Sequence, residues 1–315
     1  MKAVVYTRPL ELEFSENNDR PVAGEGEVVV DVKAVGICGS ELEGFASQSP
    51  FRVPPLIMGH EFAGITAVGE RVVVNPVISC GRCDMCVVGN SNICRERSII
   101  GIHRPGAFAE AVSVPATSIF PIPHDMEFVT AALVEPMANA IHAVRLGLSA
   151  VHRPKRVGVI GAGALGLFTA IAARREGISE IALSDLAEVR RESARSAGFE
   201  SVSSALDGEY DVIFDAVGSR TTRQSSVSLL RPRGVAVWIG LHGPDAGFDG
   251  LDLIRQEKGV LGTFVYDESD FRAAIGLVNE IDASLIATVP LEGGVDAFMG
   301  LLDGPVREIK TVLVP

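Results

Sequence analysis

Four of the five cysteines of the chain crowd into one short segment, with a spacing that is typical of metal ligands. They follow the pattern Cys80-x2-Cys83-x2-Cys86-x7-Cys94. Four thiolates suit Zn²⁺, which takes them tetrahedrally in structural sites and then has no open position for a substrate. An iron–sulfur cluster usually has a fourth ligand placed differently, and a nucleic-acid-binding zinc module requires more basic surroundings than Arg82, Arg95 and Arg97 supply. The segment therefore predicts a structural zinc site.

The fifth cysteine belongs to a second group of candidate metal ligands, which is spread over three segments. Cys38 comes first, His60 and Glu61 follow in a Gly-His-Glu run, and Glu135 precedes a proline. A soft thiolate, an imidazole and a carboxylate leave room for a water or a substrate, which is typical of catalytic zinc. The spacing alone does not show that the three segments meet. A buried cysteine and a hydrogen-bonded core histidine are the alternative interpretations.

A glycine-rich loop between an expected strand and an expected helix is typical of dinucleotide binding. The loop reads Gly161-Ala162-Gly163-Ala164-Leu165-Gly166. Gly161 permits the tight turn, Gly163 lets a pyrophosphate approach the backbone, and Gly166 lets the helix pack against the strand. The N–H groups of Ala164 and Leu165, together with the helix dipole, favour the phosphate charge. We expect this loop to bind a dinucleotide, with a plain turn as the alternative.

The acidic residue after the next expected strand indicates which dinucleotide binds. Asp185 is placed to accept hydrogen bonds from both hydroxyls of an adenosine ribose, and it would repel a 2′-phosphate. Leu186 follows it, where an NADP-binding chain more often has a small residue and then a basic one, and Arg190 is near enough to flank the adenine. The sequence therefore favours NAD over NADP. A helix cap at Asp185 is the alternative.

The periodicity of the apolar residues changes along the chain and indicates two kinds of architecture. Up to about residue 120 the pattern is that of short strands, as in 28–32 and 107–112, with a candidate helix just after Cys38. From about residue 135 strands alternate with helices, which is the pattern of a doubly wound parallel sheet. The expected strands are 156–160, 180–184, 211–216, 234–239 and 260–265, and the expected helices are 164–176, 187–197 and 221–230. From about residue 269 we expect two helices and a last strand, 310–314, which could return to the first domain.

The composition is that of an ordinary globular protein. The chain has 315 residues, of which 47% are hydrophobic and 22% charged, and this length suits two domains better than one. A formal net charge of −12 gives no general attraction to nucleic acid or to an anionic membrane, so we expect neither as a partner. We see no secretion signal, and the longest uncharged stretch, 157–173, contains four glycines that suit a strand and a turn. These features predict a cytoplasmic protein.

Together, these motifs resemble those of the zinc-containing medium-chain dehydrogenases, the superfamily of alcohol, sorbitol and threonine dehydrogenases, and most closely those of its polyol branch. The resemblance covers essentially the whole chain and rests on Gly36–Glu41, Gly59–Gly64, the four cysteines, Glu135-Pro136, the glycine loop with Asp185, and Asp211–Gly218. It implies an α/β protein with a GroES-like, partly β-barrel catalytic domain and a Rossmann doubly wound parallel-sheet domain. The expected catalytic domain is 1–138 with 264–315, including a structural zinc lobe at 80–94, and the expected NAD-binding domain is 139–263.

The resemblance implies which residues hold the catalytic zinc. Cys38 and His60 match two ligands of the family. Glu61 and Glu135 are both candidates for a further ligand, direct or through water, and the sequence does not choose between them. Glu41 matches an acid that orients the ligand histidine.

The resemblance also implies residues that act on the substrate and the cofactor. Ser40 matches the hydroxyl residue that contacts the substrate oxygen, and Lys310 falls near a basic residue that contacts the cofactor. Glu43 stands where the family has a relay histidine, so it either carries the proton or is a surface acid. Arg104 is a further candidate, either for pairing with a substrate carboxylate or as an exposed loop residue. The chain between Glu61 and Cys80 is shorter than in most relatives.

The function that follows is an NAD-dependent zinc alcohol or polyol dehydrogenase. It would transfer a hydride from a secondary alcohol of a polyol, sugar or sugar acid to NAD⁺ and give a ketone. The alternatives are a primary or aromatic alcohol dehydrogenase of the same mechanism and a non-catalytic dinucleotide-binding protein. The resemblance further implies a homodimer or homotetramer, joined through an edge strand expected at 235–240.

Overall fold

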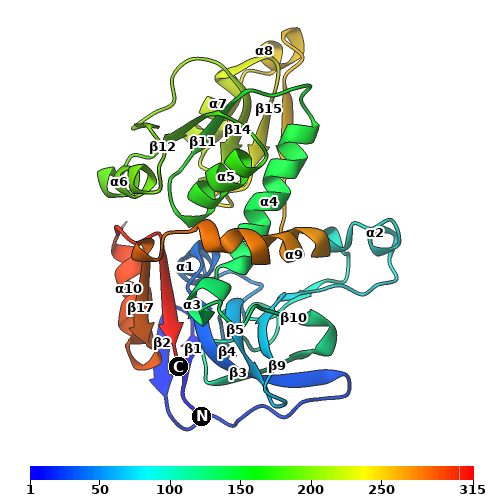
Figure 1. Cartoon of the computed structure of the whole chain (residues 1–315), viewed down its shortest axis with the longest axis vertical. Helices are drawn as coiled ribbons and strands as arrows, with labels where there is room; N and C mark the ends of the chain where they lie inside the picture. Colours follow the sequence, from blue (N-terminus) through cyan, green and yellow to red (C-terminus); the bar gives the residue numbers. More distant parts are fainter. Residues whose placement is uncertain (305) are drawn as a thin grey trace. The chain divides into compact units, whose positions relative to one another are not determined.

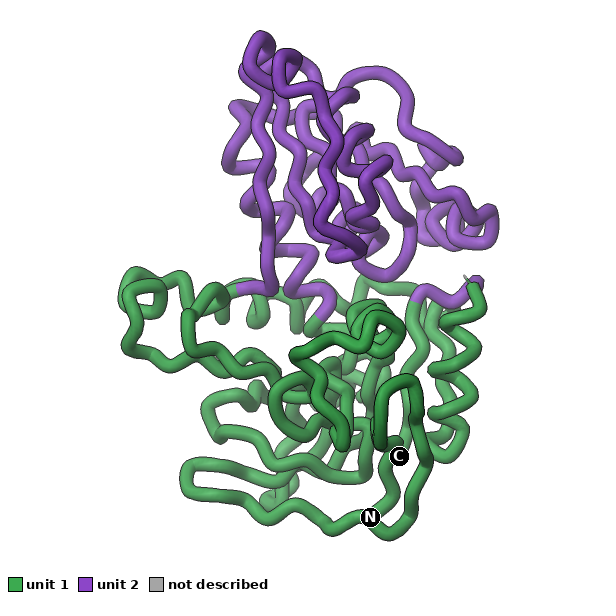
Figure 2. Tube along the Cα trace, turned by 180° about the vertical axis from the view of Figure 1, so that it is seen from behind, with its two compact units in different colours: residues 1–135, 267–304, 310–315 green, residues 136–266, 305–309 purple. Residues whose placement is uncertain are grey.

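The chain divides into two units (Figure 2). The structure is a computed structural model that describes residues 1–304 and 306–315. Unit 1 contains residues 1–135, 267–304 and 310–315, and unit 2 contains residues 136–266 and 306–309. Most of the chain after residue 266 therefore belongs to the same unit as residues 1–135. No helix among the described residues has both the length and the apolar character that crossing a bilayer requires.

The strands of unit 1 form a seven-stranded mixed sheet, a three-stranded sheet and a two-stranded ribbon (Figure 1). The large sheet has the order β10-β6-β5-β3-β18-β17, and β9 also pairs with β3. Its strands are β3 (Glu27–Gly36), β5 (Glu61–Thr66), β6 (Arg71–Val74), β9 (Ala111–Pro115), β10 (Ile119–Pro121), β17 (Ile286–Pro290) and β18 (Lys310–Val314). The order β2-β1-β4 in the small sheet joins β1 (Ala3–Arg8), β2 (Glu11–Ser15) and β4 (Leu56–Ile57), and the ribbon joins β7 (Val77–Ile78) and β8 (Ser98–Ile99).

Strand β3 is the centre of the large sheet, because it pairs antiparallel with β5, β9 and β18. Its run of valines suits an extended and half-buried backbone. The register places Gly36, at the end of β3, opposite Glu61 on one side and Val312 on the other. The end of β3, the start of β5 and the middle of β18 therefore meet within two residues of Cys38 and next to His60.

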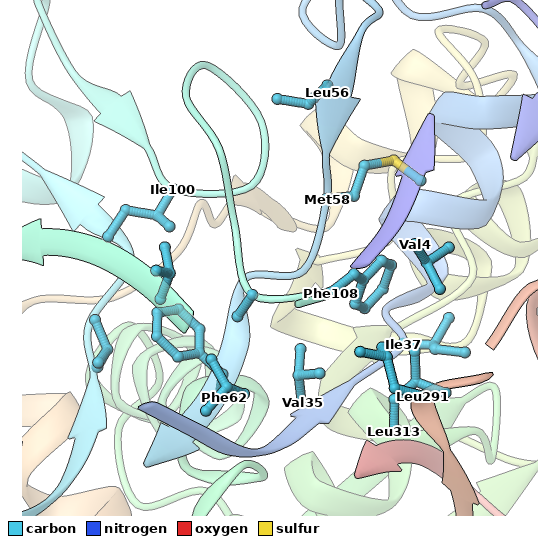
Figure 3. Packing of buried hydrophobic residues seen from close by; sticks show 14 of the residues in the cluster. Val4, Val35, Ile37, Leu56, Met58, Phe62, Ile100, Phe108, Leu291 and Leu313 are labelled. Carbon is cyan, nitrogen blue, oxygen red and sulfur yellow. The ribbon is translucent and has the colours of Figure 1, made fainter. Parts of the chain in front are cut away.

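A core of apolar side chains fixes the backbone where these strand ends meet (Figure 3). Val35 and Ile37 flank Gly36, Met58 and Phe62 flank the segment of His60, and Leu313 comes from β18. Each of these five side chains is at most 4% exposed. Burying an apolar side chain of this size stabilises the fold by about 1.5–3 kcal/mol, so the core strongly favours one placement of the polar residues between them.

Short helices complete unit 1. They are α1 (Gly39–Ala46), α2 (Asp84–Val87), α3 (Phe128–Ala131), α9 (Glu268–Leu277) and α10 (Gly294–Asp303). Phe45 of α1 contacts Phe298 of α10, with ring centroids 5.3 Å apart. Helix α4 (Val134–Ser149) begins in unit 1 and continues in unit 2. Helix α10 thus supports α1, which follows Cys38 directly.

Unit 2 contains the doubly wound parallel sheet that the sequence predicts. The strand order is β13-β12-β11-β14-β15-β16, and all neighbours are parallel. The strands are β11 (Arg156–Ile160), β12 (Glu180–Ser184), β13 (Ser201–Ser203), β14 (Tyr210–Asp215), β15 (Leu230–Trp238) and β16 (Gly259–Gly262). The helices are α5 (Ala164–Arg175), α6 (Glu188–Ser196), α7 (Arg220–Ser228) and α8 (Gly250–Arg255). All six residues of β14 are buried, as is usual for a parallel strand with both faces covered.

The expectation of an edge strand at 235–240 is wrong. This segment belongs largely to β15, which pairs with β14 on one side and with β16 on the other. The chain adds a further parallel strand after α8, so β16 is the edge at this end of the sheet. The expected strand 260–265 is correspondingly shorter, and ends at Gly262.

Two further elements of unit 1 differ from the expectation. The expected strand 107–112 begins only at Ala111, because the N–H groups of Ala107 and Phe108 donate instead to the carbonyls of Gly59 and Met58, at 2.9 and 2.8 Å. Strand β17 was not expected at all. It pairs parallel with β18 along its whole length.

Candidate functional site

His60 is held in a fixed orientation by Glu41. Nδ1 of His60 lies 2.9 Å from Oε1 of Glu41, which also accepts a hydrogen bond from the Gly59 N–H at 2.8 Å. Oε2 of Glu41 accepts one from the Cys38 N–H at 3.0 Å. Glu41 is fully buried in the first turn of α1. One carboxylate therefore joins the segments of Cys38 and His60 and leaves Nε2 of His60 for another partner.

The electrostatics around His60 favour a cation. Burial by itself lowers the pKa of His60, but the negative charges of Glu41 and Cys38 outweigh burial and raise this pKa well above its ordinary value. The same charges stabilise a metal ion beside Nε2. The surroundings of His60 thus suit a metal ligand.

Glu61 forms a buried ion pair with Lys310, which stands at the start of β18. Nζ of Lys310 lies 2.6 Å from Oε1 and 2.5 Å from Oε2 of Glu61. Both side chains are almost completely buried. A Cβ at residue 36 would lie 2.3 Å from Oε2 of Glu61, so only glycine at position 36 leaves space for this pair. Burial lowers the pKa of Lys310, but Glu61 outweighs this effect and raises it.

Cys38, His60 and Glu61 could share one metal ion. One ligand atom from each residue lies within 4.8 Å of the other two. A sulfur, an imidazole nitrogen and a carboxylate oxygen fit Zn²⁺ and leave a fourth position for a small molecule. Glu135 is buried in the first turn of α4 and is outside this close group as far as the described residues show, although its charge acts on Lys310. The structure thus brings together three of the four candidate ligands.

The Ser40 hydroxyl lies between Cys38 and an arginine that sequence reasoning missed. Oγ of Ser40 donates to Sγ of Cys38 at 3.3 Å, and Nη2 of Arg52 donates to Oγ of Ser40 at 3.2 Å. Arg52 is 7% exposed, although its neighbours Phe51 and Val53 are exposed. Neither its spacing from other residues nor a pattern of charge distinguishes Arg52 in the sequence. Glu43 is half-buried one turn after Ser40, and no hydrogen bond joins the two in the described chain.

Arg104, the other candidate arginine, is engaged within unit 1. Its Nη2 lies 2.6 Å from Oε1 of Glu27 and donates to the Ser113 carbonyl at 3.3 Å. Oε2 of Glu27 accepts a further hydrogen bond from Oγ of Ser113 at 2.7 Å. Nδ1 of His103 accepts a hydrogen bond from the N–H of Ile99. Arg104 therefore ties β3 to β9 and is not a free cation.

The four clustered cysteines converge on one point. Sγ of Cys83 lies 3.5 Å from Sγ of Cys86 and 3.8 Å from Sγ of Cys94, and the Cys80 and Cys86 sulfurs are 4.0 Å apart. Zn–S bonds of about 2.3 Å in a tetrahedron place sulfurs about 3.8 Å apart. Backbone N–H donors of Arg95 and Cys86 lower the pKa of the Cys83 thiol to about 6. All five cysteines are free thiols, and the four in this lobe fit a structural zinc.

The glycine loop has the geometry of a phosphate-binding turn. Gly161 has a φ of +95°, and a Cβ at residue 166 would lie 1.8 Å from the carbonyl oxygen of Gly161. Gly163 is the N-cap of α5 and supplies no side-chain cap, so the N–H groups of Ala164 and Leu165 in the first turn have no partner within the helix. Of the described residues, only Arg190 comes within 4 Å of a Cβ built at residue 163, with Nη1 at 3.6 Å. The loop thus offers N–H donors that the helix leaves unpaired, and space for a pyrophosphate.

Asp185 lies directly beside this loop. Its Oδ2 accepts a hydrogen bond from the Ala162 N–H at 2.9 Å, and its Oδ1 accepts one from the Ala187 N–H at 2.9 Å. Nη1 of Arg190 is 3.8 Å from Oδ2 of Asp185. Leu186 is 90% exposed. Unit 2 therefore brings together the loop, the acid and the arginine that the sequence singled out.

Comparisons with known proteins agree with both units. Residues 24–124 match the family described as "Alcohol dehydrogenase GroES-like domain", and residues 164–280 match "Zinc-binding dehydrogenase". A 2-dehydro-3-deoxy-L-galactonate 5-dehydrogenase of Pseudoalteromonas atlantica is 30% identical to this chain over an alignment of 315 positions. The alignment covers 91% of each chain.

Two solved structures resemble the whole chain. A putative zinc-binding dehydrogenase of Sinorhizobium meliloti bound to NADP has a TM-score of 0.89 and 30% identity, covering 100% of this chain and 99% of its own. An alcohol dehydrogenase of Escherichia coli complexed with NADH has a TM-score of 0.91 and 25% identity, with the same coverage.

The fold and the two cysteine-containing sites define a zinc-type oxidoreductase with a GroES-like unit and a Rossmann unit. The chain belongs to the zinc-containing medium-chain dehydrogenases, within the alcohol and polyol dehydrogenase branch. The family resemblance inferred from the motifs is thereby confirmed.

Proposed function

We propose that this protein oxidises a secondary alcohol of a polyol, sugar or sugar acid to a ketone, with zinc in the catalytic site and NAD⁺ as the hydride acceptor. The convergence of Cys38, His60 and Glu61 in unit 1 carries the proposal. A chain that only binds a dinucleotide has no need of such a donor set. The galactonate-type relative, which acts on a sugar acid according to its name, supports the substrate class.

Cys38, Nε2 of His60 and Glu61 would hold the catalytic zinc. Glu41 fixes the ring of His60, and Lys310 holds Glu61 at the site while balancing part of its charge. Glu135 lies outside the close group of ligand atoms in the described chain, so it would reach the zinc only through a water.

The chemistry divides between the bound groups and the side chains. Zinc supplies a Lewis acid that lowers the pKa of the alcohol, and NAD⁺ supplies the acceptor for the hydride. Ser40 accepts the hydroxyl proton through Oγ and passes it on, either to Glu43 or to water. The substrate carbon then loses its hydrogen with both electrons, and its oxygen becomes a carbonyl.

Unit 2 binds the cofactor through the residues that surround the glycine loop. Gly161, Gly163 and Gly166 shape the loop, and the Ala164 and Leu165 N–H groups bind the pyrophosphate. Asp185 accepts the ribose hydroxyls and Arg190 lies beside it, near enough to flank the adenine. This arrangement favours NAD over NADP because a 2′-phosphate would meet the carboxylate of Asp185.

We further propose a cytoplasmic homodimer or homotetramer. Five free thiols, four of them in a metal-binding lobe, suit a reducing compartment. Among the described residues strand β16 pairs only with β15, so this edge of the parallel sheet is the place where a second copy could pair.

A substrate screen with a matched ligand variant tests the reaction. The zinc-loaded protein is assayed for reduced cofactor with NAD⁺ and NADP⁺ across polyols, sugars, sugar acids and simple alcohols, with and without a chelator. We expect chelator-sensitive NAD⁺ reduction with a polyol or sugar acid. Cys38→Ala should abolish it and leave NADH binding intact, whereas wild-type turnover in Cys38→Ala would contradict the proposal.

A further inference from the structure

Arg52 is a buried cation next to Ser40, the residue proposed to accept the substrate proton. It has few hydrogen-bond partners within the described residues. It lies in the segment between α1 and β4 and reaches back to Ser40 through Nη2. Within residues 1–304 and 306–315 its guanidinium forms no ion pair, and its Nε is buried without a hydrogen-bond partner. Nη2 carries two N–H donors, of which Ser40 accepts one. A buried charge with unfilled donors is costly to a fold unless it serves a ligand.

The position of Arg52 is built into helix α1. A Cβ at residue 44 would lie 2.5 Å from Nη1 and 3.1 Å from Cζ of Arg52. Glycine in the middle of a helix is unfavourable, and here it leaves the space that the guanidinium fills. The orientation of Arg52 is therefore a specific feature of unit 1 and not that of a loose surface arginine.

The acids near Arg52 do not neutralise it. Its charge acts on Glu41, but the two oxygens of Glu41 already accept hydrogen bonds from Cys38, Gly59 and His60. Arg104, by contrast, is paired with Glu27. Of these two arginines, only Arg52 is left with donors for a ligand at the Ser40 side.

We propose that Arg52 is a specificity-determining residue that binds an oxyanion of the substrate, a carboxylate or a phosphate, while the substrate hydroxyl contacts Ser40. This inference rests on the proposed function and narrows it to anionic secondary alcohols. Arginine binds carboxylate and phosphate oxygens through charge-assisted hydrogen bonds, often in pairs. A chain with a net charge of −12 gives no general attraction to an anion, so such a substrate requires a local cation.

The test compares an anionic substrate with its neutral counterpart. The zinc- and NAD⁺-loaded protein is assayed with a hexonate and with the hexitol of the same configuration, and a hexitol phosphate distinguishes the two oxyanion sources. Arg52→Gln should lower kcat/KM for the anionic substrate about 10- to 100-fold more than kcat/KM for the hexitol. Arg52→Lys should keep part of the preference, because it retains the charge and loses the planar donors. Arg104→Gln is the matched control and should leave the ratio of the two kcat/KM values unchanged.

Three results would overturn the proposal. Equal losses with the anionic and neutral substrates would mean that Arg52 only positions Ser40. If Arg104→Gln lost the preference for the anionic substrate, Arg104 and not Arg52 would be the residue that binds the oxyanion. Calorimetry of hexonate and hexitol phosphate binding to the NADH-loaded protein, before and after Arg52→Gln, gives an answer that does not depend on turnover. Equal binding of both anions to wild type and Arg52→Gln would overturn the inference, whereas absence of turnover in the wild type would count against the proposed reaction.

Discussion

Nζ of Lys310 lies within 2.6 Å of both carboxylate oxygens of Glu61, and the two residues are 249 positions apart in the chain. The pair joins the start of the last strand, β18, to the start of β5, next to His60. The C-terminal strand thus supplies a side chain that fixes a candidate metal ligand. The site around Glu61 is therefore complete only when the last residues have folded onto unit 1.

Breaking this pair from one side should destabilise unit 1. Lys310→Met leaves the Glu61 carboxylate buried without its cation, and the cost of such a loss is about 3–5 kcal/mol. The double variant Glu61→Gln/Lys310→Met leaves no unpaired charge and should recover part of the loss. Urea unfolding of the wild type, Lys310→Met, Glu61→Gln and the double variant measures both quantities. A single variant as stable as the wild type would mean that the pair contributes nothing.

Removing the charge of Glu41 should weaken zinc binding at Cys38 and His60. Glu41→Gln keeps the shape of the side chain but loses the charge that orients and polarises the His60 ring. Such partners of ligand histidines typically contribute 10- to 100-fold to metal affinity, so we expect a loss of about that size. Competition with a chromophoric chelator measures the affinity.

Glu43→Gln is the matched control for Glu41→Gln, because Glu43 stands on the same helix and makes no hydrogen bond to His60 in the described structure. Zinc in the four-cysteine lobe should be retained in both variants. Equal zinc affinities in the two variants would argue against the orienting role of Glu41.

Local motifs were predictable and long-range pairings were not. The cysteine lobe and the glycine loop are encoded within single short segments, so residue type and spacing were enough to find them. The pairing of Glu61 with Lys310, of Arg52 with Ser40 and of Arg104 with Glu27 depends on which distant segments meet. Apolar periodicity carries no information about which distant segments come into contact.

The same limit explains the error about the sheet edge. The apolar pattern of residues 234–239 correctly indicates a buried strand. Periodicity identifies β16 as a strand equally well, so it does not show which of β15 and β16 lies at the edge of the sheet. The order of strands in a sheet is decided by the crossovers between them. Here α8 carries the chain one position further out, so β15 lies inside the sheet.

Replacing Cys83 should remove the zinc of the lobe and leave the other site able to bind metal. Cys83→Ser takes one thiolate from a set of four, and structural zinc sites of this kind contribute directly to folding. We expect zinc content to fall from two ions to one, with a lower melting temperature. Metal analysis after desalting and a thermal melt check this. Loss of both ions would show that the two sites do not form independently.

The pairing of Glu27 with Arg104 should give a stability contribution that disappears in acid. Hydrogen bonds from Ser113 and then Arg104 lower the pKa of Glu27 below its usual value. A carboxyl whose pKa is lower in the folded state stabilises the fold above its unfolded pKa, and this contribution is lost as the pH falls through the folded pKa.

The difference in unfolding free energy between the wild type and Glu27→Gln should therefore be largest near neutral pH, at about 1 kcal/mol for a partly exposed pair. It should shrink steadily as the pH falls below about 4, near the ordinary pKa of a glutamate. Urea unfolding of both proteins from pH 7 to pH 3 measures the difference. A gap that stays constant over this range would mean that Glu27 titrates alike in the folded and unfolded chains.

Asp185 should decide the choice between the two cofactors. Its carboxylate lies against the glycine loop through the Ala162 N–H, with Arg190 3.8 Å away. A 2′-phosphate would meet this charge, whereas a ribose with free hydroxyls can donate hydrogen bonds to it. Asp185→Ser removes the repulsion, keeps a small polar side chain and leaves Arg190 free to contact a phosphate.

We expect Asp185→Ser to weaken NADH binding about 10-fold and to strengthen NADPH binding by a similar factor, as for the loss and gain of a charge-assisted hydrogen bond. Fluorescence titration of both reduced cofactors measures the two affinities without any substrate. Asp185→Ser/Arg190→Gln is the matched control, because it removes the cation as well and should lose the gain toward NADPH. If wild-type protein already binds NADPH as tightly as NADH, the carboxylate of Asp185 does not select the cofactor, and the ribose must bind away from it.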